Sequence, residues 1–198
     1  MHLINSYRVL IFLGISALTG SIAAQSMIAV VTHCQPDERV QYSCRIGKKT
    51  VSLCGGGAAG ALTSLTYRYG AIGKIENEYV ARPESKNRFF GSVGPANPGA
   101  SISQVWFDKG KVRYLLTECT GGNCPRGGGL AVLRHDRILT NTPCADSGGD
   151  DLSLFSNDLV RFTSRVEFSR SATELLIIQE VHAYDVNKLF PTKGGPQW

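Results

Sequence analysis

The chain has 198 residues, a net charge of +5 at neutral pH and 42% hydrophobic residues. This length is enough for one domain with a proper core. Its Lys and Arg residues are scattered rather than gathered in long runs, which argues against nucleic-acid binding. A diffuse positive surface suits anionic cell-wall polymers or acidic protein partners.

The first 24 residues have the layout of a secretory signal peptide. Arg8 gives a charged start, residues 9–18 are apolar, and small residues lead up to Ala24. The apolar run is too short for a membrane span, which needs about 20 residues. We therefore predict cleavage near Ala24, export to the periplasm or out of the cell, and a single mature domain over residues 25–198. An uncleaved anchor is the alternative interpretation.

The six cysteines all lie in the mature part, at Cys34, Cys44, Cys54, Cys119, Cys124 and Cys144. An even number of cysteines in an exported chain predicts three disulfides. Cys119 and Cys124 flank a compact turn and are the pair we favour. We also expect Cys34 to pair with Cys144. Cys44 would then pair with Cys54, which requires a bulge or a chain exit because a two-residue turn places them on opposite faces. No metal site is expected, since Cys119 and Cys124 lack a matched Cys or His pair for zinc.

Alternation of apolar and polar residues recurs along the mature chain and predicts strands rather than helices. Residues 40–46 and 51–53 are expected to form a hairpin around Gly47 and Lys48. Residues 65–69 and 75–80 predict two further strands.

Residues 82–101 contain three prolines and several Gly and Asn, which predicts a long surface loop. Phe89 and Phe90 stand in it between Arg88 and a glycine, and Ser92 follows. Apolar anchors beside a positive charge in a loop are typical of a partner-binding surface. We therefore predict Arg88, Phe89, Phe90 and Ser92 as binding residues.

The clearest hairpin joins residues 105–107 and 112–117 across a turn that contains Asp and Gly. Residues 130–133 and 138–140 predict another pair, with His135 and Asp136 in the turn.

Further along the chain, residues 145–151 form a polar loop and residues 160–168 alternate as a strand. Residues 175–181 are their predicted antiparallel partner, although this run also fits a short buried helix. We expect a loose tail over 191–198. The predicted fold class is mainly β, an antiparallel sheet, sandwich or partly open barrel stapled by disulfides.

Two motifs point to ligands but lack the required context. Residues 55–60 match a glycine pattern of dinucleotide sites, yet strand-forming residues follow where that site needs a helix N-terminus. Residues 146–151 offer carboxylates for calcium but lack the EF-hand spacing. No cofactor is expected.

Catalytic candidates are equally sparse. His135 and His182 are most simply turn and strand residues, and no serine stands in a nucleophile elbow. Glu76 and Glu78 would share one face of an extended strand, as a glycosidase pair might. Exposed acids on strands usually do no chemistry, so we expect no enzyme.

Four short runs carry a resemblance to a group of small exported bacterial proteins of unknown function. They are KTVSLCG (49–55), LTYRYG (65–70), VWFDKG (105–110) and GLAVL (129–133). The resemblance covers about residues 40–144 and implies no catalytic residues. More distantly, an exported, disulfide-bonded, β-rich chain is similar to periplasmic lysozyme inhibitors and to immunity proteins. Those inhibitors use a serine-glycine-x-x-tyrosine loop, of which this chain has no copy.

The expected function is an exported, non-enzymatic binding protein that acts as an inhibitor or immunity protein against a cell-wall-degrading enzyme. Its expected partner is a protein in the periplasm or outside the cell, held by the loop over residues 82–101. A secreted hydrolase of cell-wall or glycan substrates and a structural surface module are the alternatives.

Overall fold

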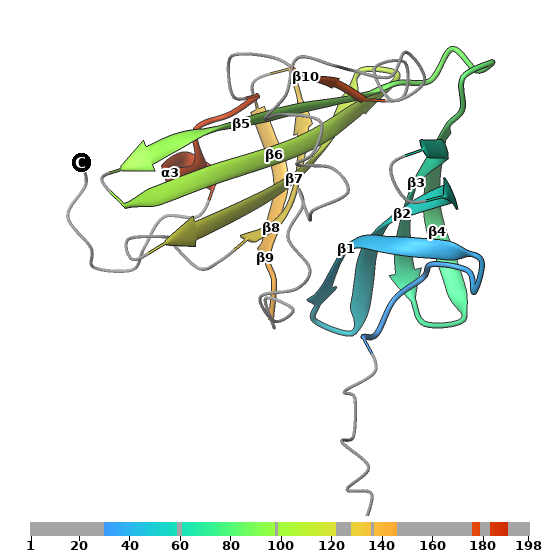
Figure 1. Cartoon of the computed structure of the whole chain (residues 1–198). Coiled ribbons are helices and arrows are strands. Elements are labelled where there is room, and N and C mark those ends of the chain that lie inside the picture. Colours follow the sequence, from blue (N-terminus) through green and yellow to red (C-terminus); the bar gives the residue numbers. More distant parts are fainter. Residues whose placement is uncertain are drawn as a thin grey trace, which may run out of the picture.

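The computed structural model describes residues 30–58, 61–97, 99–121, 128–135, 137–145, 176–178 and 183–189. They form two β-sheets (Figure 1). The four-stranded sheet is antiparallel, in the order β1 (Glu38–Ile46), β2 (Lys49–Ala58), β3 (Ala61–Ala71), β4 (Lys74–Ala81). The six-stranded sheet has the order β10 (Leu176–Ile178), β5 (Phe89–Asn97), β6 (Ala100–Lys109), β7 (Val112–Gly121), β8 (Gly128–Arg134), β9 (Arg137–Pro143). A short helix, α3 (Val186–Leu189), comes last.

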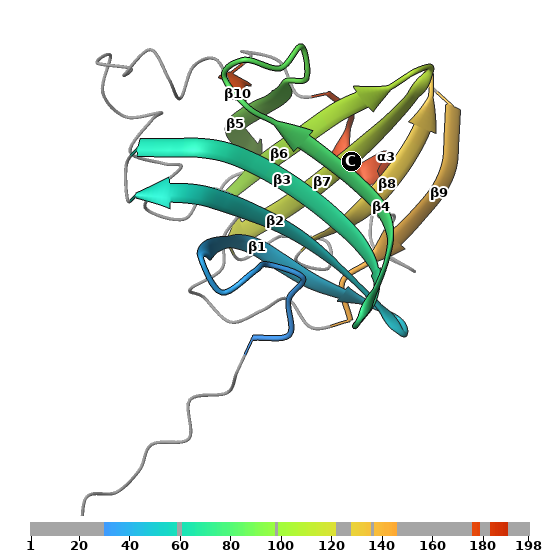
Figure 2. The ribbon, with the colours of Figure 1, turned by 90° about the vertical axis from the view of Figure 1, so that its right-hand side faces the viewer.

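The two sheets face each other (Figure 2). Aromatic side chains from both sheets form a shared core between them. Tyr67 of the four-stranded sheet meets Phe107 of the six-stranded sheet with ring centroids 4.9 Å apart. Phe107 also stacks on Tyr79 from β4 and on Tyr114 from β7. Each aromatic buries on the order of 150 to 250 Å², so these contacts hold the layers together. The predicted mainly β fold is confirmed, and its arrangement is a sandwich.

The outer face of the six-stranded sheet carries a second apolar cluster. Trp106 and Leu115 are buried there beneath Leu189 of α3. The side-chain amide of Gln104 donates to the Tyr184 carbonyl at 2.6 Å, and the Tyr184 N–H donates to the Gln104 side-chain oxygen at 3.2 Å. These bonds fix the segment that leads into α3.

Three of the predicted strand pairs appear where alternation and turn residues agree. Gly47 has a φ of 60° in the β1–β2 turn and Gly110 a φ of 64° in the β6–β7 turn. Glycine reaches this left-handed region without steric cost, which explains why the two hairpins form there. β8 pairs with β9, as expected. The two strands predicted over residues 65–69 and 75–80 are also present, and they pair with each other as β3 and β4.

The prediction of a surface loop over residues 82–101 is wrong from Phe89 onward. Residues 89–97 form β5, and β6 begins at Ala100. Pro95 is accommodated because β10 pairs only with the first three residues of β5, so the later part of β5 lacks that neighbour among the described strands. The loop that remains, residues 82–88, connects the two sheets.

Two of the predicted disulfide pairings are also wrong. The structure joins Cys34 to Cys54 and Cys44 to Cys144. Cys44 belongs to the core between the sheets, and its cross-strand partner on β2 is Val51. Cys54 lies three residues beyond Val51 on β2. A bulge near residues 40–42 does form, but it lies too far along β1 to turn Cys44 toward Cys54.

The third predicted pairing falls partly outside the described residues. Cys119 is disulfide-bonded, and Cys124 lies outside the described residues. The other described cysteines are all in disulfides as well. The Tyr42 hydroxyl donates to the Cys144 sulfur at 3.0 Å, beside the bond that ties β1 to the end of β9.

Several expectations concern residues that the structure does not describe. These are the signal peptide over 1–24, the loop over 146–151, the strand over 160–168 and the tail over 191–198. Within 175–181 a strand is present at 176–178, and the partner that the structure gives it is β5, in parallel. None of the described helices is both long and apolar enough to cross a membrane.

Candidate binding site

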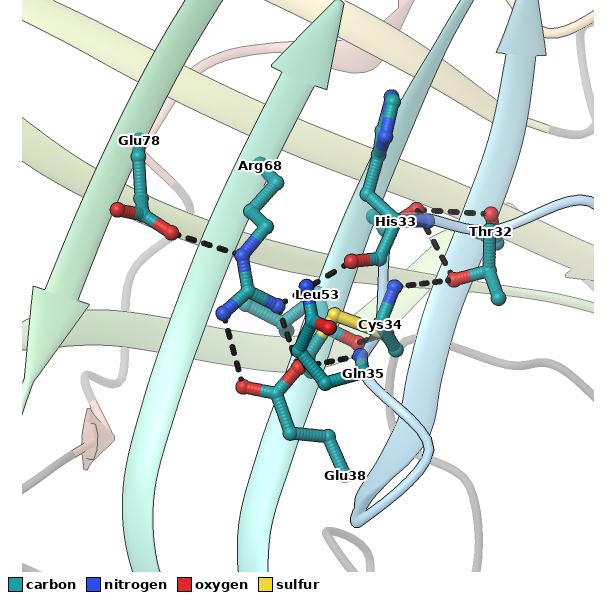
Figure 3. Close-up of polar contacts among 11 residues, drawn as sticks. Thr32, His33, Cys34, Gln35, Glu38, Leu53, Arg68 and Glu78 are labelled. Carbon is teal, nitrogen blue, oxygen red and sulfur yellow. Dashed lines mark hydrogen bonds and ion pairs between the residues drawn. A yellow bond between two sulfur atoms is a disulfide. The ribbon is translucent and has the colours of Figure 1, made fainter. Parts of the chain in front are cut away.

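A segment before β1 lies across the outer face of the four-stranded sheet and is fixed there by polar contacts (Figure 3). We call residues 32–38 the N-terminal strap. The His33 N–H donates to the Ser52 hydroxyl at 3.0 Å, and the His33 Nε2 lies 3.0 Å from the Gly70 carbonyl oxygen. The Cys34–Cys54 disulfide adds a covalent link between strap and β2. The strap is therefore attached to this face of the sheet through β2 and β3.

Arg68 of β3 is the main polar anchor of the N-terminal strap (Figure 3). Its guanidinium forms two hydrogen bonds to the Glu38 carboxylate and one, at 2.7 Å, to Glu78 on β4. It also donates to the His33 carbonyl at 3.3 Å. Because these bonds occupy most of its donors, Arg68 serves the fold and is a poor candidate for ligand binding.

The charges in this cluster shift each other's pKa. Burial alone would raise the pKa of the Glu38 carboxyl, but hydrogen bonds from Arg68 and the Gln35 N–H, with the Arg68 charge, bring it below its ordinary value. The bond to Glu38 raises the pKa of Arg68. The possible ligand atoms of Cys34, Glu38 and Cys54 lie within 4.8 Å of one another. They do not form a metal site, because both sulfurs are in a disulfide and offer no thiolate.

Positive charge gathers at the hairpin ends of both sheets. The four turns lie along one side of the molecule, the right-hand side in Figure 2. Their cationic residues are Arg45, Lys48, Lys49 and Lys74 on the four-stranded sheet and Lys109, Lys111, Arg113, Arg134 and Arg137 on the six-stranded sheet. We call these nine residues the cationic side.

Acidic residues neutralise only part of the cationic side. Glu76 pairs with Lys49 at 2.6 Å, and Asp108 pairs with Arg113 at 2.9 Å. Arg134 and Arg137 are direct cross-strand partners on β8 and β9, and both are exposed. Like charges placed opposite each other destabilise a strand pair, so a negative ligand here would relieve that repulsion.

An open hollow of about 360 Å³ lies within the cationic side, between two neighbouring turns. Asp108, Gly110, Lys111 and Arg113 of the β6–β7 hairpin line it, together with His135 from the β8–β9 turn. The start of β7 pairs with the end of β8, which brings the two turns side by side. Pockets of this size hold small ligands or single side chains.

The structure does not bring the predicted binding residues to an exposed loop. Phe89 is 0% exposed and packs in the core between the sheets, with its ring 5.5 Å from that of Phe107. Phe90 is half-buried and stacks on Trp106. The prediction that these two rings are surface anchors is wrong, because both belong to a paired strand.

The other two predicted binding residues are also committed to the fold. Ser92 is 0% exposed in β5. The Arg88 guanidinium donates to the carbonyls of Ser85 and Asn87, and its backbone N–H donates to the Tyr79 hydroxyl. These contacts close the connection between the sheets.

The structure also separates the two carboxylates that the sequence suggested as a glycosidase pair. Glu76 and Glu78 do not share a face, because a bulge in the β3–β4 pairing lies next to Glu76. Glu76 reaches Lys49, which lies over the Tyr69 ring, whereas Glu78 reaches Arg68 beside the N-terminal strap.

The first four residues of the glycine pattern, 55–58, form the end of β2. Gly55 leaves room there for the Gln41 side chain. His135 has a φ of 53°, which is uncommon for a residue other than glycine. The turn that this histidine occupies was predicted from the sequence, but its position at the edge of a hollow was not. Only the pairing of β7 with β8 creates that neighbourhood.

Comparison of the chain with protein-family models, with curated proteins and with solved structures finds no match. The resemblance drawn from short sequence runs therefore stays a prediction.

Proposed function

We propose that this chain is an exported, non-enzymatic binding protein that inhibits or neutralises an acidic protein partner. The observation that carries the proposal is the cationic side, where Lys48, Lys74, Lys111, Arg134 and Arg137 have no ion-pair partner among the described residues. Such one-sided charge steers an oppositely charged partner into contact and fixes its orientation.

The proposed partner is a cell-wall-degrading enzyme. Glycan hydrolysis commonly uses a pair of carboxylates that flank the bond to be cleaved, so the clefts of such enzymes carry negative charge. A rigid surface of tight turns with excess positive charge complements such a cleft. The sandwich provides the rigidity, because each turn of the cationic side joins strands that are paired along their length.

Export of the chain is part of the proposal. It is supported by the signal-peptide layout of residues 1–24 and by described cysteines that are all in disulfides. Disulfides persist in oxidising compartments, where a wall-degrading enzyme also acts.

The hydrolase alternative has less support. The carboxylates that suggested it, Glu76 and Glu78, are held in separate ion pairs with Lys49 and Arg68. A catalytic pair must instead face a common substrate site.

The test is charge reversal at the tips of the four-stranded sheet. Mature protein over residues 25–198 is immobilised and used to capture partners from the compartment in which it resides. The Lys48→Glu/Lys74→Glu variant should lose most of the captured partner, because the double reversal replaces attraction by repulsion. Captured enzyme is then assayed for wall hydrolysis with and without added protein, and inhibition is expected.

The matched control is Arg82→Glu/Lys86→Glu, which makes the same change of charge in the loop between the sheets. Arg82 and Lys86 are exposed. The control should capture partner as the unmodified protein does. Equal loss in both variants, or a captured enzyme that works at full rate with the protein bound, would contradict the proposal.

A further inference from the structure

The hollow between the β6–β7 and β8–β9 turns is bordered by side chains that contact one another. Arg113 is held in one position from two sides: it makes two hydrogen bonds to Asp108, at 2.9 and 3.0 Å, and its guanidinium lies 5.8 Å from the Trp106 ring centroid. Trp106 is itself buried. One wall of the hollow is therefore rigid, and its Asp108 charge is neutralised by Arg113.

The other lining groups supply hydrogen-bond donors that have no partner among the described residues. Lys111 is exposed and makes no ion pair among the described residues. His135 is exposed in the adjoining turn, where its left-handed φ of 53° fixes the direction in which the chain presents its side chain. Backbone conformations of this kind are maintained at ligand sites more often than elsewhere.

The charges around the hollow define the ligand. Asp108 is matched by Arg113, which leaves the ammonium of Lys111 in excess in the lining of the hollow. Arg134 and Arg137 stand on either side of the turn that supplies His135. A cationic pocket of about 360 Å³ that opens to solvent suits a compact oxyanion on a larger molecule.

We infer that this hollow binds an oxyanion, a carboxylate or a phosphate group, through Lys111 and His135. The inference deepens the proposed function and rests on it, since the oxyanion is the acidic group that the partner presents. Lys111 contributes charge and ammonium donors, and His135 contributes a ring nitrogen. Arg113 and Asp108 position the floor of the pocket.

Nuclear magnetic resonance of isotope-labelled mature protein tests this site directly. The protein is titrated separately with acetate and with inorganic phosphate, while sodium chloride keeps the ionic strength constant. We expect saturable shifts of the Gly110, Lys111 and His135 amide signals with at least one of the two anions. The anion that saturates at the lower concentration identifies the source, a carboxylate or a phosphate.

Three variants and one control variant establish whether the two named side chains cause the shifts. Lys111→Ala should weaken binding about fivefold, the scale of an exposed charge interaction, and Lys111→Arg should restore it. His135→Gly should also weaken binding, while glycine keeps the left-handed backbone of the turn. Lys86→Ala, on the loop between the sheets, should leave binding unchanged.

Non-saturable shifts with both anions, or binding that Lys111→Ala leaves unaltered, would overturn the inference. Loss of partner capture in Lys48→Glu/Lys74→Glu would still support the proposed function in that case. The two results are therefore separable.

Discussion

Arg68 shows how one side chain can secure a whole segment. It joins β3 to Glu38 at the start of β1 and to Glu78 on β4, and Glu38 is only 11% exposed at its side chain. Removing the arginine would leave the Glu38 carboxylate largely buried without its main hydrogen-bond donor, which is costly.

We predict that Arg68→Met lowers the free energy of unfolding by about 1.5 to 3 kcal/mol, the range for hydrogen bonds to charged groups. Urea denaturation at neutral pH measures it. Lys188→Met, at an exposed residue of α3, is the control and should change stability little. A loss below about 0.5 kcal/mol for Arg68→Met would show that the ion pairs contribute little.

The same contact predicts a pH dependence. The pKa of Glu38 is below its ordinary value of 4.5 in the folded protein, so the unfolded chain binds the proton more readily. The stabilisation is therefore complete above pH 4.5 and is lost as the pH falls through the lowered folded value. Thermal unfolding between neutral pH and pH 3 should show a steeper acid loss for the unmodified protein than for Arg68→Met. Parallel curves would contradict this assignment.

At the scale of elements, β5 marks where sequence patterns stop being informative. The β1–β2 and β6–β7 hairpins could be predicted because alternation and turn glycines agree. β5 contains Gly91, Gly94 and Pro95, which are typical of loops, and its pairing with β6 and, over its first three residues, with β10 makes it a strand. Pairing with neighbouring strands overrode local propensity there.

Phe89 and Phe90 give a matched test of this strand. Phe89→Ala should cost about 3 to 5 kcal/mol, because it removes a ring that is 0% exposed from the core between the sheets. Phe90→Ala should cost less, since Phe90 is only half-buried. Urea denaturation of both variants decides the matter. A free energy of unfolding that Phe89→Ala leaves almost unchanged would indicate that Phe89 lies in an exposed loop.

At the scale of the whole molecule, the disulfides depend on contacts that no local pattern reveals. The N-terminal strap has no strand periodicity, so its path over the outer face of the four-stranded sheet could not be predicted. That path brings Cys34 to Cys54 and leaves Cys44 to join Cys144 across the sandwich. The hollow at His135 was missed for a similar reason, because it exists only where two hairpins meet.

The two disulfides should differ in their effect on stability. Cys44 and Cys144 are 100 residues apart and Cys34 and Cys54 are 20 apart. Loop entropy predicts a loss of about 5 kcal/mol for Cys44→Ser/Cys144→Ser and about 3 kcal/mol for Cys34→Ser/Cys54→Ser. Urea denaturation of the two variants gives the comparison. A larger loss from the shorter loop would contradict the entropic account.

The proposed function depends on the cationic side, and carbodiimide coupling of the protein to its captured partner tests that surface most directly. This reagent joins an amine to a carboxylate only where the two are already in contact. Mass spectrometry should find Lys48, Lys74 or Lys111 joined to Asp or Glu residues of the partner. Links confined to Lys86 and Lys188, with the partner still bound, would place the interface elsewhere and contradict the account.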